Sequence, residues 1–329
     1  MAYETERQVA IEAVILASRL CRGVRETLVS DETLAKKDKS PVTVADYGAQ
    51  ALVSAALADA FPQDPLVGEE DATDLRSPAN AELREKVVAA VSQVSPDLSA
   101  EQILAAIDRG NYAGGGTGRH WTLDPIDGTK GFLRNEQYAV ALALIENGEV
   151  VLGVLGCPNL PADAGEPDGE TGCLFVAVQG EGAFQQAFAG SGARPIRVTD
   201  VADPAQASFC ESVESGHSSH GHAAEIAALL GVTAPPIRMD SQAKYASVAR
   251  GDASIYLRLP TRAGYEEKIW DHAAGLIVIQ EAGGQVTDTT GKPLDFSLGR
   301  TLRENTGVVA TNGKLHDQVV AAVREVLQG

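Results

Sequence analysis

Hydrophobic positions in the first thirty residues recur at spacings of three and four. This pattern predicts an amphipathic helix over 5–29. Its apolar face consists of Val9, Ala13, Leu16, Leu20, Val24 and Leu28. A β-branched run then predicts a short strand over 42–45, followed by a helix over 47–60.

The next segments alternate between helical and strand patterns. Residues 66–74 are predicted to form an acidic loop, and residues 80–94 a helix. A second helix over 99–110 begins with Ser99 and Gln102 in the pattern of a capping box.

Two β-rich runs flank Asn147-Gly148, a dipeptide that favours a tight hairpin turn. Further strands are predicted within 173–188 and 194–200. This part of the chain therefore combines helices with a largely antiparallel sheet.

From residue 207 onward, strand and helix patterns alternate as in an α/β protein. The predicted strands are 207–213, 253–259, 285–289 and 307–311. The predicted helices are 221–230, 242–250, 271–282 and 314–327. We therefore expect two domains, an α+β domain over 1–203 and an α/β domain over 204–329.

Composition limits the classes of partner. The 329 residues include 27 Lys and Arg against 45 Asp and Glu, a net charge of −18. Such a surface repels nucleic acid and anionic membranes, so we expect neither as a partner. An anionic substrate would need local positive charge or a metal ion to overcome this field.

Two further features bear on the compartment. The four cysteines lie far apart without a CxxC pair, which indicates neither a zinc site nor a disulfide framework and favours a reducing compartment, the cytoplasm. Glu4, Glu6 and Glu12 argue against a targeting peptide. The longest clean apolar run, 139–145, is too short to span a membrane.

Acidic residues gather at four predicted element ends. They are Asp46, the pair Glu69 and Glu70, the pair Asp124 and Asp127, and Asp271. Each has an ordinary structural interpretation. Asp46 and Asp271 could be helix N-caps, the first pair a solvated loop, and the second pair a turn closed by Asx hydrogen bonds.

The stretch "DPIDGT" also permits a metal site. Pro125 restricts the backbone, so Asp124 and Asp127 could converge, with the Ile126 carbonyl as a further oxygen ligand. Oxygen ligands are those that Mg²⁺ prefers, and two cations about 3.5–4 Å apart would neutralise the acids and clamp a phosphate.

The residues after these acids suit the same chemistry. Gly128 would allow the backbone to approach a ligand closely, and Thr129 is placed to begin a helix. The N–H groups and hydroxyl there would face a phosphate oxygen or an attacking water.

Three motifs together carry a family resemblance. "GEE", "WTLDPIDGTKGF" and "WDHAAGLIVIQEAGG" occur in this order, and the chain resembles the inositol monophosphatase-like superfamily of Mg²⁺-dependent, lithium-sensitive phosphatases. "SPVTVADYGAQALV", "DSQAKYASVARGDASIYLRLP" and "GYEEKIWDHAAG" are similar to the 3'(2'),5'-bisphosphate nucleotidases of yeasts and plants. The resemblance extends from about residue 5 to the C-terminus.

The resemblance implies a fold and a set of metal ligands. The fold would be an α+β domain followed by an α/β domain, layered as an α-β-α-β-α sandwich. Glu69, Asp124 and the Ile126 carbonyl would hold one Mg²⁺, and Asp124, Asp127 and Asp271 a second. A third ion would bind near Glu69, making two to three per site.

The resemblance also implies a reaction. Asp46 and Thr129 would orient and help deprotonate a metal-activated water, which attacks phosphorus in line. The implied substrate is 3'-phosphoadenosine 5'-phosphate, giving AMP and phosphate, with 3'-phosphoadenylyl sulfate as a second one. No obligate protein partner is implied.

Substrate choice is expected to depend on the C-terminal half. Ser241, Lys244 and Arg258 would bind the phosphate that is not cleaved, and His217 would pack on adenine. We expect none of the four to touch the metal ions. By residue type alone, the two basic side chains could equally be ordinary surface charges.

Other functions stay open from the sequence. The superfamily includes inositol phosphatases, so an inositol phosphate is the alternative substrate. A protein that binds metal or nucleotide without catalysis is a rival of another class, although all the matched acids and Thr129 are present. The histidines at 217, 220 and 222 lack a fourth partner at a zinc-site spacing.

Overall fold

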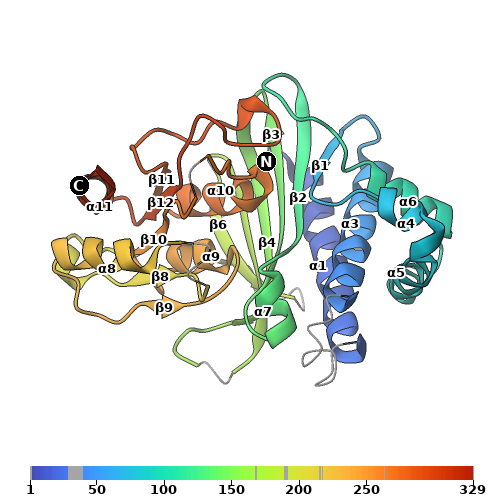
Figure 1. The fold of residues 1–329 in the computed structure, drawn as a ribbon, viewed down its shortest axis with the longest axis horizontal. Coiled ribbons are helices and arrows are strands. Elements are labelled where there is room, and N and C mark those ends of the chain that lie inside the picture. The colour runs from blue at the N-terminus through green and yellow to red at the C-terminus, as the bar shows by residue number, and fades with distance from the viewer. Residues whose placement is uncertain are drawn as a thin grey trace.

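The computed structural model describes residues 2–28, 40–166, 169–188, 192–214, 216, 218–262 and 264–328. Two β-sheets alternate with three layers of helices, so that the order across the molecule is helix, sheet, helix, sheet, helix (Figure 1). The predicted α-β-α-β-α sandwich is therefore confirmed.

The helices and strands have the following bounds. The described α-helices are α1 (Glu4–Leu28), α3 (Ser40–Ala60), α4 (Thr73–Arg76), α5 (Ala81–Val94), α6 (Ala100–Asp108), α7 (Thr129–Arg134), α8 (His220–Leu229), α9 (Ala243–Arg250), α10 (Ala273–Glu281) and α11 (His316–Gln328). Short 3-10 turns are η1 (Pro78–Asn80), η2 (Pro204–Gln206), η3 (Ile269–Asp271) and η4 (Phe296–Leu298). The strands are β1 (Leu66–Gly68), β2 (Arg119–Asp127), β3 (Ala139–Glu146), β4 (Glu149–Pro161), β5 (Thr171–Val178), β6 (Gly182–Ala187), β7 (Arg194–Pro195), β8 (Phe209–Glu211), β9 (Ile237–Arg238), β10 (Ile255–Arg258), β11 (Gln285–Thr287) and β12 (Val308–Thr311).

The first sheet runs in the order β1 to β7 and is antiparallel except for the β1–β2 pair. Alternate residues of β3 face opposite layers, as the period of a strand requires. Val140, Leu142 and Leu144 pack with α1 and α3, whereas Ala141 and Ala143 pack toward α9 and α10.

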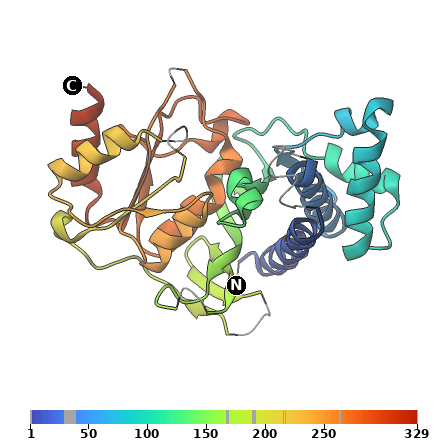
Figure 2. The same ribbon diagram turned by 60° about the horizontal axis from the view of Figure 1, so that its bottom comes forward.

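The second sheet has the order β11-β12-β10-β8-β9. One face packs on α9 and α10, and the other on α8 and α11. The helices α9 and α10 therefore lie between the two sheets and share one apolar core with both of them (Figure 2). The first sheet ends at Pro195 and the second begins at Phe209. A domain boundary near residue 203 stays a prediction.

The predicted strand over 42–45 is wrong, because helix α3 already begins at Ser40. Val42 and Val44 favour strands locally, but both are buried, and α3 packs against α1, α5, α6 and β2. A helix that is apolar on nearly all sides is stable when neighbours surround it, and this tertiary burial outweighs the local β-propensity.

The predicted acidic loop over 66–74 is also partly wrong. Leu66–Gly68 forms β1, which pairs in parallel with residues 121–123 of β2. Three residues carry too little pattern to indicate a strand, and pairing with a segment over fifty positions away decides the matter.

Two predictions from short sequence motifs elsewhere in the chain are confirmed. Asn147 and Gly148 both have positive φ, 51° and 84°, as a two-residue hairpin turn between β3 and β4 requires. Ser99 and Gln102 form the predicted capping box of α6. Along the described part of the chain, no helix combines the length and apolar character needed to cross a membrane.

Candidate active site

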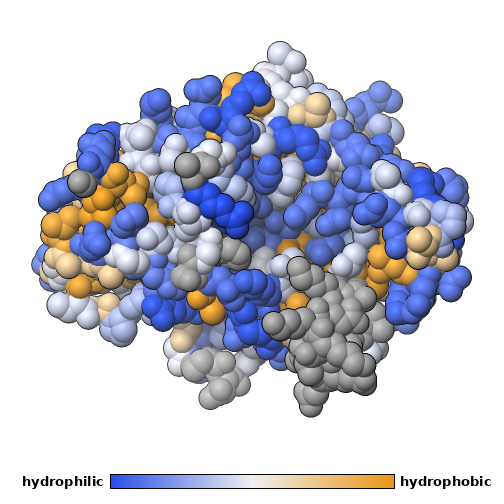
Figure 3. All heavy atoms as spheres, viewed as in Figure 1, coloured by the Kyte–Doolittle hydropathy of each residue, from blue (hydrophilic) through white to orange (hydrophobic). Residues whose placement is uncertain are grey.

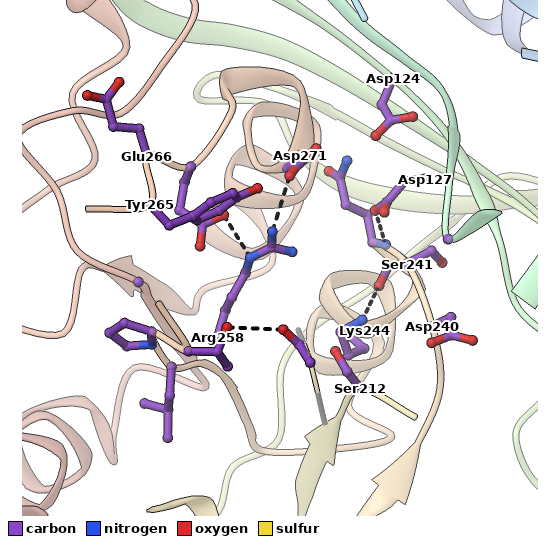
Figure 4. A pocket seen from close by; sticks show the side chains of 18 of the residues that line it. Asp124, Asp127, Ser212, Asp240, Ser241, Lys244, Arg258, Tyr265, Glu266 and Asp271 are labelled. Carbon is purple, nitrogen blue, oxygen red and sulfur yellow. Dashed lines mark hydrogen bonds and ion pairs between the residues drawn. The ribbon is translucent and has the colours of Figure 1, made fainter. Parts of the chain in front are cut away.

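A cavity of about 580 Å³ lies where residues of both halves of the chain meet. Its lining includes all five predicted metal-ligating residues, which are Glu69, Asp124, Ile126, Asp127 and Asp271. Figure 4 shows Asp124, Asp127 and Asp271 around a common space, although they come from different elements. The face in Figure 3 is largely hydrophilic; its largest group of apolar side chains lies around α8 and α11, and smaller groups lie at the right and top of the view.

A bulge in β2 explains how Asp124 and Asp127 share this cavity. Residues three apart on a regular strand point to opposite faces. Here Asp124 pairs with Ala141 and Asp127 with Ala139, so β2 contains one residue more than β3 between these pairs. The extra residue reverses the alternation and brings both carboxylates to one side of the sheet.

Gly128 and Thr129 follow as predicted. Gly128 adopts a φ of 87°, and a Cβ atom there would lie 2.9 Å from Ser241 Cβ. Glycine is therefore required both by the backbone conformation and by the close approach of the next layer. Thr129 begins α7, and its side chain is exposed in the cavity wall.

The acids of the cavity repel one another. Reduced hydration and the neighbouring charge of Asp271 raise the pKa of Glu69 to about 8, although its side chain opens into the cavity. Burial and the charge of Glu69 raise the pKa of Asp124 well above its usual value. Burial also raises the pKa of Asp271, against the opposing charge of Arg258.

These residues fit a hard divalent cation. Asp124 is 3% exposed, and its Oδ1 is buried without a hydrogen-bond partner among the described residues. The atoms that could coordinate a metal ion here are all oxygen atoms, the type of ligand that Mg²⁺ prefers. A cation would both satisfy this oxygen and offset the repulsion between the carboxylates.

Asp46 does not open a helix, because it lies well inside α3. The N-cap interpretation is therefore wrong for this residue. Asp46 does not line the cavity, but it is buried, and its Oδ1 has no hydrogen-bond partner among the described residues. Burial and the charges of Glu70 and Glu69 raise its pKa well above the usual value.

Asp271 is not an N-cap either. It ends the turn η3, and His272 occupies the cap position of α10. Asp271 Oδ2 instead lies 3.3 Å from Arg258 Nη2 (Figure 4). The guanidinium of Arg258 therefore also compensates the charge of this carboxylate, a contact that was not predicted from the sequence.

The other two members of the predicted anion clamp meet in the cavity wall. Lys244 is 4% exposed, and its Nζ donates to the carbonyls of Ser241 (2.8 Å) and Met239 (3.4 Å). Ser241 has a φ of 69°, which turns the chain sharply before α9. His217 lies outside the described residues, while the neighbouring Gly216 lines the cavity.

A buried network behind Arg258 was not predicted from the sequence. Glu267 Oε2 lies 2.7 Å from Arg258 Nε and 3.1 Å from His272 Nε2, and Tyr245 Oη lies 2.8 Å from His272 Nδ1. Burial opposes ionisation of Glu267, but His272 and Arg258 outweigh it and lower its pKa to about 2. The only signal was an acid four positions before Asp271.

Gln242 was also missed, and its sequence context carries no signal. Its backbone N–H donates to Asp127 Oδ2 at 2.6 Å, and its side-chain amide donates to the Trp270 carbonyl at 2.9 Å. The residue thus ties Asp127 to the segment that carries Asp271.

Residues 2–328 match the model of the inositol monophosphatase family. This chain belongs to that family. The family is generally Mg²⁺-dependent, which agrees with the oxygen-rich cavity.

Curated relatives extend over almost the whole chain. A 3'(2'),5'-bisphosphate nucleotidase of Schizosaccharomyces pombe is 48% identical, over 99% of this chain and 97% of its own length. One named 3'(2'),5'-bisphosphate nucleotidase 1, from Arabidopsis thaliana, is 50% identical, over 99% and 97%. The solved inositol monophosphatase of Anabaena shares the fold, with a TM-score of 0.65 and 23% identity over 99% of this chain and 97% of that one.

Proposed function

We propose that this member of the inositol monophosphatase family is a Mg²⁺-dependent phosphatase acting on 3'-phosphoadenosine 5'-phosphate. It would remove the 3'-phosphate and release AMP, with 3'-phosphoadenylyl sulfate as a second substrate. The observation that carries the proposal is the cavity itself, in which acids for metal ions face Lys244 and Arg258. The names of the relatives at 44–50% identity support the choice of nucleotide.

The proposed metal ligands are those that line the cavity. Glu69, Asp124 and the Ile126 carbonyl would hold one Mg²⁺, and Asp124, Asp127 and Asp271 another, with a third near Glu69 when substrate is bound. Bound Mg²⁺ would supply positive charge against the phosphate oxygens and help to ionise the attacking water.

The chain's own groups complete the chemistry. We assign Asp46 and Thr129 together to orienting the attacking water and helping to deprotonate it. Burial and repulsion raise the pKa of Asp46, which makes its carboxylate a stronger base than an ordinary aspartate. Gly128 would let the backbone approach the phosphate that is cleaved.

The spectator 5'-phosphate would bind on the opposite wall. A lysine ammonium has three N–H donors, and two carbonyl bonds leave one of those of Lys244 for an anion. Ser241 and the free N–H groups of Arg258 would complete the clamp, with His217 against the adenine. These contacts distinguish a bisphosphate nucleotide from a monophosphate ester of a small polyol.

Parallel assays of phosphate release test the proposal. The substrates would be 3'-phosphoadenosine 5'-phosphate, inositol 1-phosphate and fructose 1,6-bisphosphate, each with Mg²⁺ and with EDTA. We expect Mg²⁺-dependent release that is fastest from the nucleotide. Faster phosphate release from inositol 1-phosphate would show that an inositol phosphate is the substrate. Binding of the nucleotide without release of phosphate would indicate a non-catalytic protein.

The proposal needs only small-molecule partners. Neither nucleic acid, membrane nor an obligate protein partner has a part in it. The proposed compartment is the cytoplasm, on the strength of the four widely spaced cysteines.

A further inference from the structure

Arg300, in the loop after η4, reaches across the molecule to the segment that carries Glu69. Its Nη1 donates to the carbonyls of Gly110 and Tyr112, each at 3.0 Å, and its Nη2 donates to the carbonyl of Gly68 at 2.5 Å. Gly68 directly precedes Glu69, so the guanidinium holds the peptide on one side of a proposed metal ligand.

The peptide on the other side of Glu69 is held from helix α3. Gln50 is fully buried; its Oε1 accepts from Glu70 N–H at 3.1 Å, and its Nε2 donates to the Glu70 carbonyl at 2.6 Å. The same Nε2 donates to the Ile107 carbonyl at 2.9 Å. A Cβ atom on Gly68 would lie 2.5 Å from Gln50 Oε1, so this attachment leaves little room for adjustment.

Arg300 is also attached to the segment that carries Asp271. Its carbonyl accepts from Ile269 N–H at 3.2 Å, and the adjacent residues Thr301 and Lys268 form an isolated β-bridge. Its guanidinium carbon lies 4.9 Å from the centre of the Trp270 ring. One residue therefore contacts the chain beside Glu69 and beside Asp271.

Glu69 and Asp271 repel each other, so their separation must be fixed by the surrounding chain. We propose that Arg300 is a positioning residue that sets the separation of Glu69 and Asp271, and thereby the affinity of the cavity for divalent cations. It acts through the backbone, since Arg300 does not line the cavity. The inference rests on the proposed function, in which these two acids bind metal.

Arginine suits this task better than lysine. Its planar guanidinium presents several N–H donors in a fixed arrangement and stacks on aromatic rings. A lysine ammonium could not reach three carbonyls and cover Trp270 at the same time. We therefore expect Arg300→Lys to show the same type of defect as Arg300→Met, to a smaller degree.

The test measures Mg²⁺ binding directly, by calorimetry on the nucleotide-free enzyme, together with the Mg²⁺ concentration for half-maximal phosphate release. In Arg300→Met we expect the Kd for Mg²⁺ and the half-maximal Mg²⁺ concentration each to rise by roughly 10- to 100-fold, the scale of a lost charge-assisted hydrogen bond. At saturating Mg²⁺, kcat and the KM for nucleotide should return close to wild type. If Arg300→Met does not fold, Arg300→Lys is tested in the same way.

Arg250→Met is the matched control. Arg250 is another largely buried arginine that donates to a backbone carbonyl (Pro161, 2.7 Å), pairs with a neighbouring side chain (Asp252) and lies over an aromatic ring (Phe175, 5.7 Å). Its loss should lower Tm without changing Mg²⁺ affinity, because none of these partners adjoins Glu69 or Asp271.

Two results would overturn the inference. One is unchanged Mg²⁺ affinity in both Arg300 variants. The other is a loss of Mg²⁺ affinity in Arg250→Met as large as the loss in Arg300→Met. Either result leaves the proposed function intact if the wild type binds Mg²⁺ and hydrolyses the nucleotide. Absence of Mg²⁺ binding by the wild type would instead refute the proposed function.

Discussion

The environment of Asp124 indicates both the free-energy cost of the cavity and the kind of ligand that it binds. It is almost completely buried, it is repelled by Glu69, and one of its oxygens has no partner among the described residues. Burying such a carboxylate costs free energy unless an opposite charge compensates it. The arrangement is therefore suited to binding a cation rather than to stabilising the fold.

Asp124→Asn should abolish phosphate release and Mg²⁺ binding, because one carboxylate is assigned to both ions. The metal-free variant should also have a higher Tm than the metal-free wild type, since it lacks a buried and uncompensated charge. Phosphate release and thermal unfolding in EDTA measure the two effects. Activity within about tenfold of wild type, or wild-type activity that persists in EDTA, would contradict the assignment.

Lys244 and Arg258 have different additional partners in the protein. Their substitution should therefore affect kcat/KM differently for nucleotides with and without a 5'-phosphate. Lys244→Met should lower kcat/KM for 3'-phosphoadenosine 5'-phosphate by roughly 10- to 150-fold, the worth of a charge-assisted hydrogen bond. Adenosine 3'-monophosphate lacks the 5'-phosphate and should be affected much less.

Arg258→Ala provides the contrast. It should lower kcat/KM for both nucleotides, because Arg258 also pairs with Glu267 and Asp271. Equal losses for both nucleotides in Lys244→Met would make Lys244 a structural residue and remove it from the anion clamp.

At the scale of an element, helix α3 serves both the core and the cavity. Its buried side chains pack against α1 and the first sheet, while Gln50 fixes the loop of Glu69. Asp46 lies on the same helix, away from either end. A carboxylate buried inside a helix contributes nothing as a cap, which agrees with the chemical role proposed for Asp46.

Asp46→Asn separates chemistry from stability. The shape of the side chain is kept, and turnover should fall by roughly 10²- to 10⁴-fold, the usual worth of a general base. The free energy of unfolding should not fall, because a buried charge is removed. Ser99→Ala is the opposite control, since loss of a true N-cap costs about 1 kcal/mol and should leave turnover unchanged. Normal turnover in Asp46→Asn would exclude the role of base.

For the whole molecule, the repelling acids link stability to pH and metal. The pKa of Glu69 rises from 4.5 to about 8 on folding, so the metal-free native state binds more protons than the unfolded chain between these values. Stability without metal should therefore fall as pH rises from about 4.5 to about 8. Mg²⁺ replaces those protons, so its stabilising effect should grow over the same range.

Thermal unfolding between about pH 5 and pH 8.5, with EDTA or with Mg²⁺, measures this dependence. Glu69→Gln should make the metal-free profile less steep, because it removes one of the acids whose pKa is raised on folding. A metal-free Tm that increases with pH through this window would show that the acids are compensated by protein groups alone.

The sequence by itself determined the features that depend on neighbouring residues. The Asn147-Gly148 turn, the capping box of α6 and the start of α7 at Thr129 each need only a few adjacent positions. The acidic motifs likewise indicated which residues meet in the cavity, through their resemblance to a phosphatase family.

Only the tertiary structure decided the features that depend on distant partners. Residues 42–45 are helical because neighbouring layers bury them, and β1 exists because β2 pairs with it. The contacts of Arg258 with Glu267 and of Arg300 with Gly68 also join segments whose proximity no local pattern encodes. Burial and long-range hydrogen bonds contribute more free energy at these places than local propensity does, and their partners are fixed only when the layers pack.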